Sequence, residues 1–297
     1  MIRNMEELQK AAIAKGIKKV SVAAAHDEGA LSAVKMAYDA GLAEAILVGD
    51  KEKIQEMLPE TGLPEDIEIV DVKDAAEAAK EAVRLVHDGR ADMVLKGLVN
   101  TSDFLRGVLN KECGLRTDQR LCHTAVLEIP GYDKLLFTSD GGMNVLPDVE
   151  TKLSIIRSNV AALQALGVER PKVAVLTANE NVDPNMPATV DAAEIVERLK
   201  EEDFPAIVEG PIAMDVALDP EMAAHKHIES QISGDPDLLI FPNIEAGNIF
   251  GKSMVHFAGA RACGAILGTA APVVMISRAS TPDEKLCAIA LGCAISG

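Results

Sequence analysis

The chain has 297 residues, of which 48% are hydrophobic and 25% charged, a composition typical of soluble globular proteins. This length exceeds what one hydrophobic core usually supports, so we expect two domains. The formal net charge of −17 disfavours nucleic acid and anionic membrane surfaces as partners, because both select a basic surface.

The first third of the chain alternates between strand and helix patterns. A helix pattern over 5–15 precedes four short runs rich in β-branched and apolar residues, and helical spacing separates them. The runs lie at 19–25, 45–50, 67–72 and 91–99. Because helices commonly connect parallel strands, this alternation predicts a parallel sheet covered on both faces.

The fourth of these strands leads into a polar helix start. Lys96, Thr101, Ser102 and Arg106 fall together at this change from strand to helix. A helix N-terminus at a strand exit favours anions, and Arg matches phosphate with two hydrogen bonds. Taken alone, Arg106 is more typical of a solvated helix face than of an anion site. The group as a whole predicts an anion site.

Residues 111–120 are charged and only weakly periodic, so we interpret them as a crossing between domains. Two adjacent strands, 123–129 and 134–138, follow with a turn over 130–133. Further strands are predicted at 172–177, 206–211 and 238–243, with helix patterns between them. A long helix is then predicted through Val255, Ala258, Ala262 and Ile266. These patterns indicate a first α/β domain over 1–118 plus 264–297 and an inserted second α/β domain over 119–263.

The final strand ends in residues that do not belong in a dry core. The apolar run 271–276 stops at Ser277 and Arg278, and Thr281 then opens a helix with Glu284 in capping-box register. Arg278 therefore stands between a strand end and a helix N-terminus, where anionic ligands bind. Asp283 and Glu284 are carboxylates beside this site and are candidates for a general base, although capping alone also explains Glu284.

Other chemistries find less support in the residues. His225 and His227 are two apart and point to different faces of a helix, so we predict no metal site. Cys122 and His123 are a candidate thiol and base, yet catalytic partners are seldom adjacent in sequence. The five cysteines include no CxxC pair, no export signal opens the chain, and no run reaches about 18 apolar residues. We therefore expect a cytoplasmic protein without a membrane partner.

Four segments resemble the phosphate acyltransferase family, that is, phosphate acetyltransferases and phosphate butyryltransferases. They keep the order of the family and extend through almost the whole chain, at 96–106, 209–215, 241–249 and 272–278. The butyryl branch looks closer, because of the compact length, the Glu-Ala-Gly-Asn stretch at 245–248 and the stretch Glu-Ile-Pro-Gly-Tyr-Asp at 128–133.

This resemblance implies a fold, a reaction and a set of site residues. The fold is two three-layer α/β domains with mostly parallel sheets, like isocitrate and isopropylmalate dehydrogenases, with a cleft between them and a homodimer through the second domain. The reaction converts acyl-CoA and phosphate into acyl phosphate and CoA by direct transfer, with CoA and phosphate as substrates and no cofactor. The implied catalytic residues are Ser277 and Arg278 with Asp283 or Glu284, and the implied substrate-binding residues are Arg106, Lys96, Thr101, Ser102 and Asn248.

Three alternatives remain open at this point. An acetyl-specific member of the same family differs from a butyryl enzyme only in pocket size. A metal-dependent hydroxyacid dehydrogenase of the same fold would need a cluster of aspartates for its metal. A non-catalytic CoA-binding protein would need neither the acidic residues nor the arginines. This chain has both, which speaks against that alternative.

Overall fold

The computed structural model describes residues 2–276 and 280–297, and its contacts divide the chain into two compact units. We call Met5–Asp118 with Cys263–Gly297 the N-terminal unit. Gln119–Ala262, together with residues 2–4, form the central unit. Strand β10 (Arg261–Leu267) carries the chain from the central unit back into the N-terminal unit.

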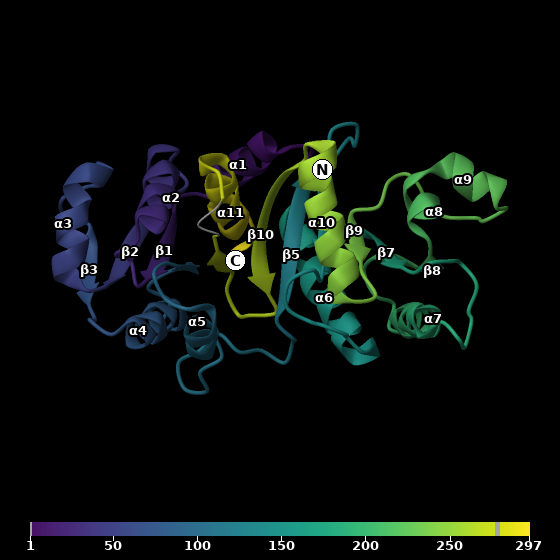
Figure 1. Cartoon of the computed structure of the whole chain (residues 1–297), viewed down its shortest axis with the longest axis horizontal. Helices are drawn as coiled ribbons and strands as arrows, with labels where there is room; N and C mark the ends of the chain where they lie inside the picture. The colour runs from purple at the N-terminus through teal and green to yellow at the C-terminus, as the bar shows by residue number, and fades with distance from the viewer. Residues whose placement is uncertain (1, 277–279) are drawn as a thin grey trace. The chain divides into compact units, whose positions relative to one another are not determined.

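The N-terminal unit is built on a parallel sheet (Figure 1). Its parallel strands stand in the order β3-β2-β1-β4-β11, and β10 pairs with β11 in the antiparallel sense. The strands are β1 (Lys18–Ala23), β2 (Ala43–Gly49), β3 (Glu68–Asp71), β4 (Met93–Lys96) and β11 (Val273–Met275). The helices are α1 (Met5–Ala14), α2 (Glu28–Asp39), α3 (Lys51–Thr61), α4 (Ala75–His87), α5 (Thr101–Val108) and α11 (Pro282–Ile295).

Helices cover both faces of this sheet, as the alternation of patterns predicts. α11 packs against α1 and α2, whereas α4 packs against α5 and β1. Figure 1 shows α2 and α11 on one side of the sheet and α4 and α5 on the other. Asp27, Asp50 and Asp74 cap α2, α3 and α4 by accepting backbone N–H groups of the first turn. The helices therefore begin soon after the strand exits that precede them.

The central unit contains a second set of mostly parallel strands. Their order is β5-β6-β9-β7-β8, and only the pairing of β5 with β6 is antiparallel among the strand pairs described in this unit. The strands are β5 (Cys122–Glu128), β6 (Leu136–Ser139), β7 (Lys172–Leu176), β8 (Ile207–Ile212) and β9 (Leu238–Ile240). The helices are α6 (Val149–Ala165), α7 (Pro187–Glu201), α8 (Met214–Leu218), α9 (Pro220–His225) and α10 (Ile244–Ala258).

The predicted adjacent strands β5 and β6, joined by a turn, are confirmed, and they pair in the antiparallel sense. The predicted long helix through Val255 to Ile266 is wrong beyond Ala258. Gly259 follows α10 with a φ of 69°, a left-handed conformation that glycine adopts without strain and that ends helices. The apolar residues beyond it belong to β10 and not to a helix. Among the described residues, no helix has the length and apolar character needed to span a membrane.

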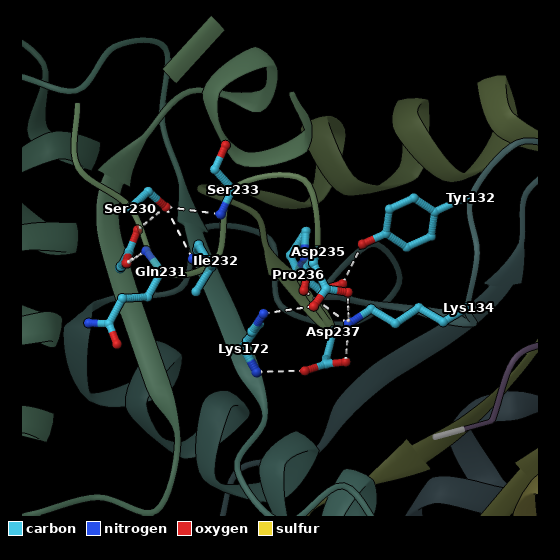
Figure 2. A network of polar contacts seen from close by, with 11 residues as sticks. Tyr132, Lys134, Lys172, Ser230, Gln231, Ile232, Ser233, Asp235, Pro236 and Asp237 are labelled. Carbon is cyan, nitrogen blue, oxygen red and sulfur yellow. Dashed lines mark hydrogen bonds and ion pairs between the residues drawn. The ribbon is translucent and has the colours of Figure 1, made fainter. Parts of the chain in front are cut away.

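A partly buried ion-pair network anchors the segment that leads into β9 (Figure 2). The Lys134 side chain is only 3% exposed, and its Nζ lies 2.5 Å from a carboxylate oxygen of Asp237 and 2.7 Å from one of Asp235. Lys172 binds the other oxygen of Asp235 at 2.7 Å and donates its backbone N–H to Asp237. The Tyr132 hydroxyl donates to the carbonyl of Pro236. The network therefore connects the β5–β6 turn with the starts of β7 and β9.

The two lysines outweigh the effect of burial on the pKa of Asp235. Burial alone would raise the pKa of this carboxyl, but the hydrogen bonds from Lys134 and Lys172 hold the pKa below its usual value. A carboxyl whose pKa is lower in the folded chain stabilises the fold above the unfolded pKa of about 3.9. This contribution is therefore present at neutral pH and is lost as the pH falls through the folded pKa.

We expect Lys134→Met to lower the free energy of unfolding of the central unit by about 3–5 kcal/mol at pH 7, because the buried Asp237 carboxylate loses its cation. Lys172→Met is the matched control. Its side chain and that of its partner Asp235 are 29% and 47% exposed, so we expect a loss of at most about 1 kcal/mol. Urea unfolding followed by circular dichroism measures both. Equal losses in the two variants would contradict a special role for the buried pair.

Candidate functional site

The carboxyl ends of β1, β4 and β11 meet at one edge of the sheet in the N-terminal unit. Lys96 pairs with Ala23 on one side and with Met275 on the other, so the three strands end at the same level. Ligands bind at this edge in open α/β sheets. Lys96 ends β4, α5 follows with Thr101, Ser102 and Arg106, and α11, the helix that follows β11, begins with Asp283 and Glu284 in its first turn. This edge is therefore the candidate functional site.

The exit of β4 brings Lys96, Thr101 and Ser102 to this edge. Lys96 is the last residue of β4, and Thr101 and Ser102 form the first turn of α5. The side chain of Asn100 caps this helix by accepting the backbone N–H of Asp103 at 2.8 Å, and the Ser102 hydroxyl donates to the same oxygen at 2.7 Å. The predicted group is therefore assembled around a capped helix N-terminus, which favours an anion nearby.

Arg106 lies one turn further along α5 and is largely exposed. Its guanidinium, 74% exposed, forms an ion pair with Asp103 within the same helix. Solvent screens such surface pairs strongly, so Asp103 is a weak competitor for a phosphate group that approaches Arg106. The role predicted for Arg106 in phosphate binding stays a prediction.

The exit of β11 leads to the predicted catalytic pair. Ser277 and Arg278 lie outside the described residues, and the description resumes shortly before α11. The predicted capping box at the start of α11 is confirmed, since Thr281 accepts the backbone N–H of Glu284 at 3.2 Å and the Glu284 carboxylate accepts that of Thr281 at 2.8 Å. Asp283 stands next to Glu284 in the first turn. Glu284 therefore has the helix-capping role that the sequence pattern predicts.

Asn248 belongs to the central unit and not to this edge. It lies on α10, and its side-chain amide donates to the carbonyl of Gly141 at 3.0 Å. A Cβ atom on Gly141 would lie 2.8 Å from the backbone of Gly247, and one on Gly142 would lie 3.0 Å from the ring of His123. These glycines therefore allow close packing of the 139–144 loop against α10 and β5.

His26 is a residue of this edge that the sequence patterns for anion binding do not single out. It follows β1 three residues after Ala23 and precedes Asp27, the N-cap of α2. Burial, the largest effect, and the nearby charge of Lys53 lower the pKa of its imidazole, against the opposing effects of Asp50 and Asp27. The sequence feature that could have identified His26 is its position at a strand exit, which it shares with the predicted site residues.

The alternative chemistries do not gain support from the structure. Burial raises the pKa of the Cys122 thiol to about 12, so this group stays protonated and inert at neutral pH. Cys263, Cys287 and Cys293 are buried too. Within residues 2–276 and 280–297, no three Cys, His, Asp or Glu side chains are grouped so that they could hold a metal ion.

Comparison with known proteins relates the whole chain to one family. Residues 72–293 match the model of the family described as phosphate acetyl/butaryl transferase. The phosphate butyryltransferase of Clostridium acetobutylicum is 42% identical over 299 residues, covering 100% of this chain and 99% of that protein. The phosphate acetyltransferase of Thermotoga maritima is 38% identical, covering 97% of this chain and 98% of that protein.

Comparison with solved structures relates the fold of the chain to the same family. A branched-chain phosphotransacylase from Enterococcus faecalis superimposes with a TM-score of 0.83 at 32% identity, covering 94% of this chain and 99% of that one. The 4-hydroxythreonine-4-phosphate dehydrogenase of Klebsiella pneumoniae has a TM-score of 0.61 at 13% identity, covering 95% of this chain and 100% of that one. The second likeness concerns the fold alone, and it agrees with the dehydrogenase-like α/β architecture predicted from the sequence.

Proposed function

Because the chain belongs to the phosphate acetyl/butaryl transferase family and is a phosphate acyltransferase, we propose that its substrates are butyryl-CoA and orthophosphate. The supporting observation is the 42% identity to a phosphate butyryltransferase over the full length of both chains. The reaction yields butyryl phosphate and CoA and is reversible. CoA and phosphate act as substrates, and the proposal includes no cofactor, metal or nucleic acid.

Acetyl-CoA is the second candidate for the acyl substrate. The 38% identity to a phosphate acetyltransferase is close to the value for the butyryl relative, so identity separates the two weakly. Two methylene groups distinguish the acyl chains, and a pocket discriminates one methylene by roughly 1–3 kcal/mol. Relative rates with the two thioesters therefore decide between these candidates.

We propose direct transfer between the two substrates. In the direction of thioester synthesis, the CoA sulfur attacks the carbonyl carbon of the acyl phosphate, the carbon–sulfur bond forms, and the carbon–oxygen bond to phosphate breaks. The thiol proton passes to a carboxylate as the sulfur attacks. A free thiol has a pKa of about 8.5, so a carboxylate that removes its proton is worth roughly 10²- to 10⁴-fold in rate at neutral pH. Burial of four of the five cysteines supports a route without an acyl-enzyme thioester.

Asp283 is the carboxylate that we propose as the base. Glu284 holds the backbone N–H of Thr281 in the capping box, and protonation of its carboxylate would weaken that hydrogen bond. Asp283 lies in the same first turn, and the capping box consists of Thr281 and Glu284. We propose that Ser277, Arg278 and Arg106 bind the phosphoryl group and stabilise the negative charge that develops during transfer. The other substrate-binding residues that we propose are Lys96, Thr101, Ser102 and Asn248.

We also propose a cytoplasmic homodimer that assembles through α10. Ala246 and Phe250 of this helix pack against the core of the central unit. Ile249 and Phe257 point elsewhere, with 65% and 91% of each residue exposed. Residues four and eight apart lie on one helix face, so Ile249, the partly exposed Ser253 and Phe257 form a stripe along α10. Large exposed apolar residues that are grouped in this way are typical of association surfaces.

We expect CoA release from butyryl-CoA to depend on phosphate, with kcat/KM at least about tenfold above that for acetyl-CoA. A thiol reagent measures the release, and reactions without phosphate correct for hydrolysis. A preference for acetyl-CoA would replace the first candidate by the second. Release that does not require phosphate would contradict both.

The two carboxylates are separated by isosteric variants. We expect Asp283→Asn to lower kcat by roughly 10²- to 10⁴-fold, because it removes the carboxylate that accepts the thiol proton. Glu284→Gln keeps an oxygen that can accept the Thr281 N–H, so its kcat should stay within about threefold of the wild type. The reverse pattern, with Glu284→Gln inactive and Asp283→Asn active, would assign the base to Glu284.

For the homodimer, we expect Phe257→Asp to weaken self-association by at least about 30-fold, because it places a charge in an apolar contact. Ile17→Asp is the matched control, since Ile17 is an apolar residue of the N-terminal unit that is 62% exposed. Sedimentation velocity over a dilution series measures both. Equal dissociation constants for the two variants would remove α10 from the interface.

A further inference from the structure

The loop between β1 and α2 lies where the strand order of the N-terminal unit reverses. From β1 the chain passes through α2 to β2 and then to β3, and α4 returns it to β4 on the other side of β1. The exits of β1 and β4 then lead to α2 and α5, which lie on opposite sides of the sheet (Figure 1). Diverging exits of this kind leave a crevice between two neighbouring strands, and open α/β sheets bind ligands there.

The two exits remain hydrogen-bonded at the base of this crevice. Gly97 donates its N–H to the carbonyl of Ala23 at 2.8 Å, and Leu98 donates to that of Ala24 at 2.9 Å. A Cβ atom on Gly97 would lie 2.6 Å from the Ala24 oxygen, so only glycine permits this approach. Ala24 has a φ of 51°, a left-handed conformation that is costly for a residue with a Cβ atom. Strain of this kind is concentrated at functional sites.

His26 follows this strained turn, and its two ring nitrogens have different surroundings. Nδ1 is buried without a hydrogen-bond partner and lies 3.1 Å from the point that a Cβ atom on Gly49 would occupy. The residue as a whole is partly exposed, and Nε2 is not among the buried unpartnered atoms. Nε2 is therefore the nitrogen that can meet a ligand.

The charged groups around His26 are already engaged locally. The Asp27 carboxylate accepts the backbone N–H of Ala30 at 2.8 Å, and Asp50 forms an ion pair with Lys53 at 3.3 Å. Burial, followed by the charge of Lys53, lowers the pKa of the imidazole against the effects of Asp50 and Asp27, so the ring is neutral at pH 7. A buried N–H without an acceptor is rarer in proteins than an unpaired acceptor, which places the single proton on Nε2. His26 thus offers one neutral N–H donor.

We propose that the Nε2–H of His26 donates a hydrogen bond to a phosphoryl oxygen of a substrate bound at this strand-order reversal. This inference rests on the proposed function, whose substrates carry such oxygens on orthophosphate, on the acyl phosphate and on CoA. A neutral donor binds them without placing a further charge beside Asp27, Asp50 and Lys53. His26 is then a substrate-binding residue in addition to the basic residues predicted from the sequence.

Two variants of His26 separate the two nitrogens. The amide of His26→Gln reaches the position of Nε2, whereas the shorter His26→Asn reaches only that of Nδ1. A hydrogen bond to a charged group is worth roughly 10- to 100-fold in affinity, so we expect His26→Asn to raise one substrate KM by about that factor. We expect His26→Gln to recover most of the loss. His225→Asn, an exposed histidine of the central unit, is the matched control.

The two possible sources of the oxygen are distinguished by the KM that changes. A rise for phosphate alone assigns the contact to orthophosphate, and a rise for butyryl-CoA alone assigns it to the phosphates of CoA. An unchanged KM for both substrates in His26→Asn would overturn the proposal. Equal losses in the Asn and Gln variants, which indicate a purely structural role, would overturn it too.

A measurement on the wild-type chain covers the case in which a variant does not fold, and it does not depend on turnover. In protein labelled with ¹⁵N-histidine, we expect the Nε2 resonance of His26 to shift on addition of orthophosphate or of CoA. If neither ligand moves this resonance, the proposal is wrong even when the enzyme is active. If the resonance shifts but the chain releases no CoA from any acyl-CoA, the proposed substrates fail and the His26 contact stands.

Discussion

The parallel register that brings Ala23, Lys96 and Met275 to one level is the constraint on which the candidate site depends. Each strand alone ends in an ordinary polar loop, and only their pairing places the three loops at one edge. A slip of one residue would turn every side chain of a strand to the opposite face of the sheet. Backbone hydrogen bonds and buried apolar strands therefore locate the site, and the polar side chains supply its chemistry.

Local sequence patterns predict much of the fold, and the main error of this prediction has a local cause. The alternation of strands and helices predicts the covered parallel sheet, because apolar periodicity reflects which side chains are buried. Periodicity does not distinguish a buried helix from a buried strand over a short run, so β10 was predicted as a continuation of α10. Gly259 marks the boundary, since a left-handed residue ends the helix. The strand order reflects contacts between distant segments, which patterns in a single sequence do not contain.

Features of the site can be predicted from the sequence where the residues contact near neighbours in the chain. The capping box of Thr281 and Glu284 is a contact across three residues, and the sequence alone reveals it. The importance of His26 depends instead on a neighbouring strand and on the burial of one ring atom, which only the fold establishes. The predicted boundaries of the two domains and the cleft between them stay predictions. The roles of Ser277 and Arg278 do as well, since they lie outside the described residues.

The N-terminal unit is discontinuous in sequence, and this has a consequence for synthesis on the ribosome. Gln119–Ala262 lies between its two segments and forms the continuous part of the central unit. β11 lies between β4 and β10 in the sheet, and α11 packs against α1 and α2. The N-terminal unit therefore stays incomplete, with one flank of β4 uncovered, until residues 263–297 have been translated. Domains generally fold as units from the N-terminus during synthesis, but here the segment made first is completed last.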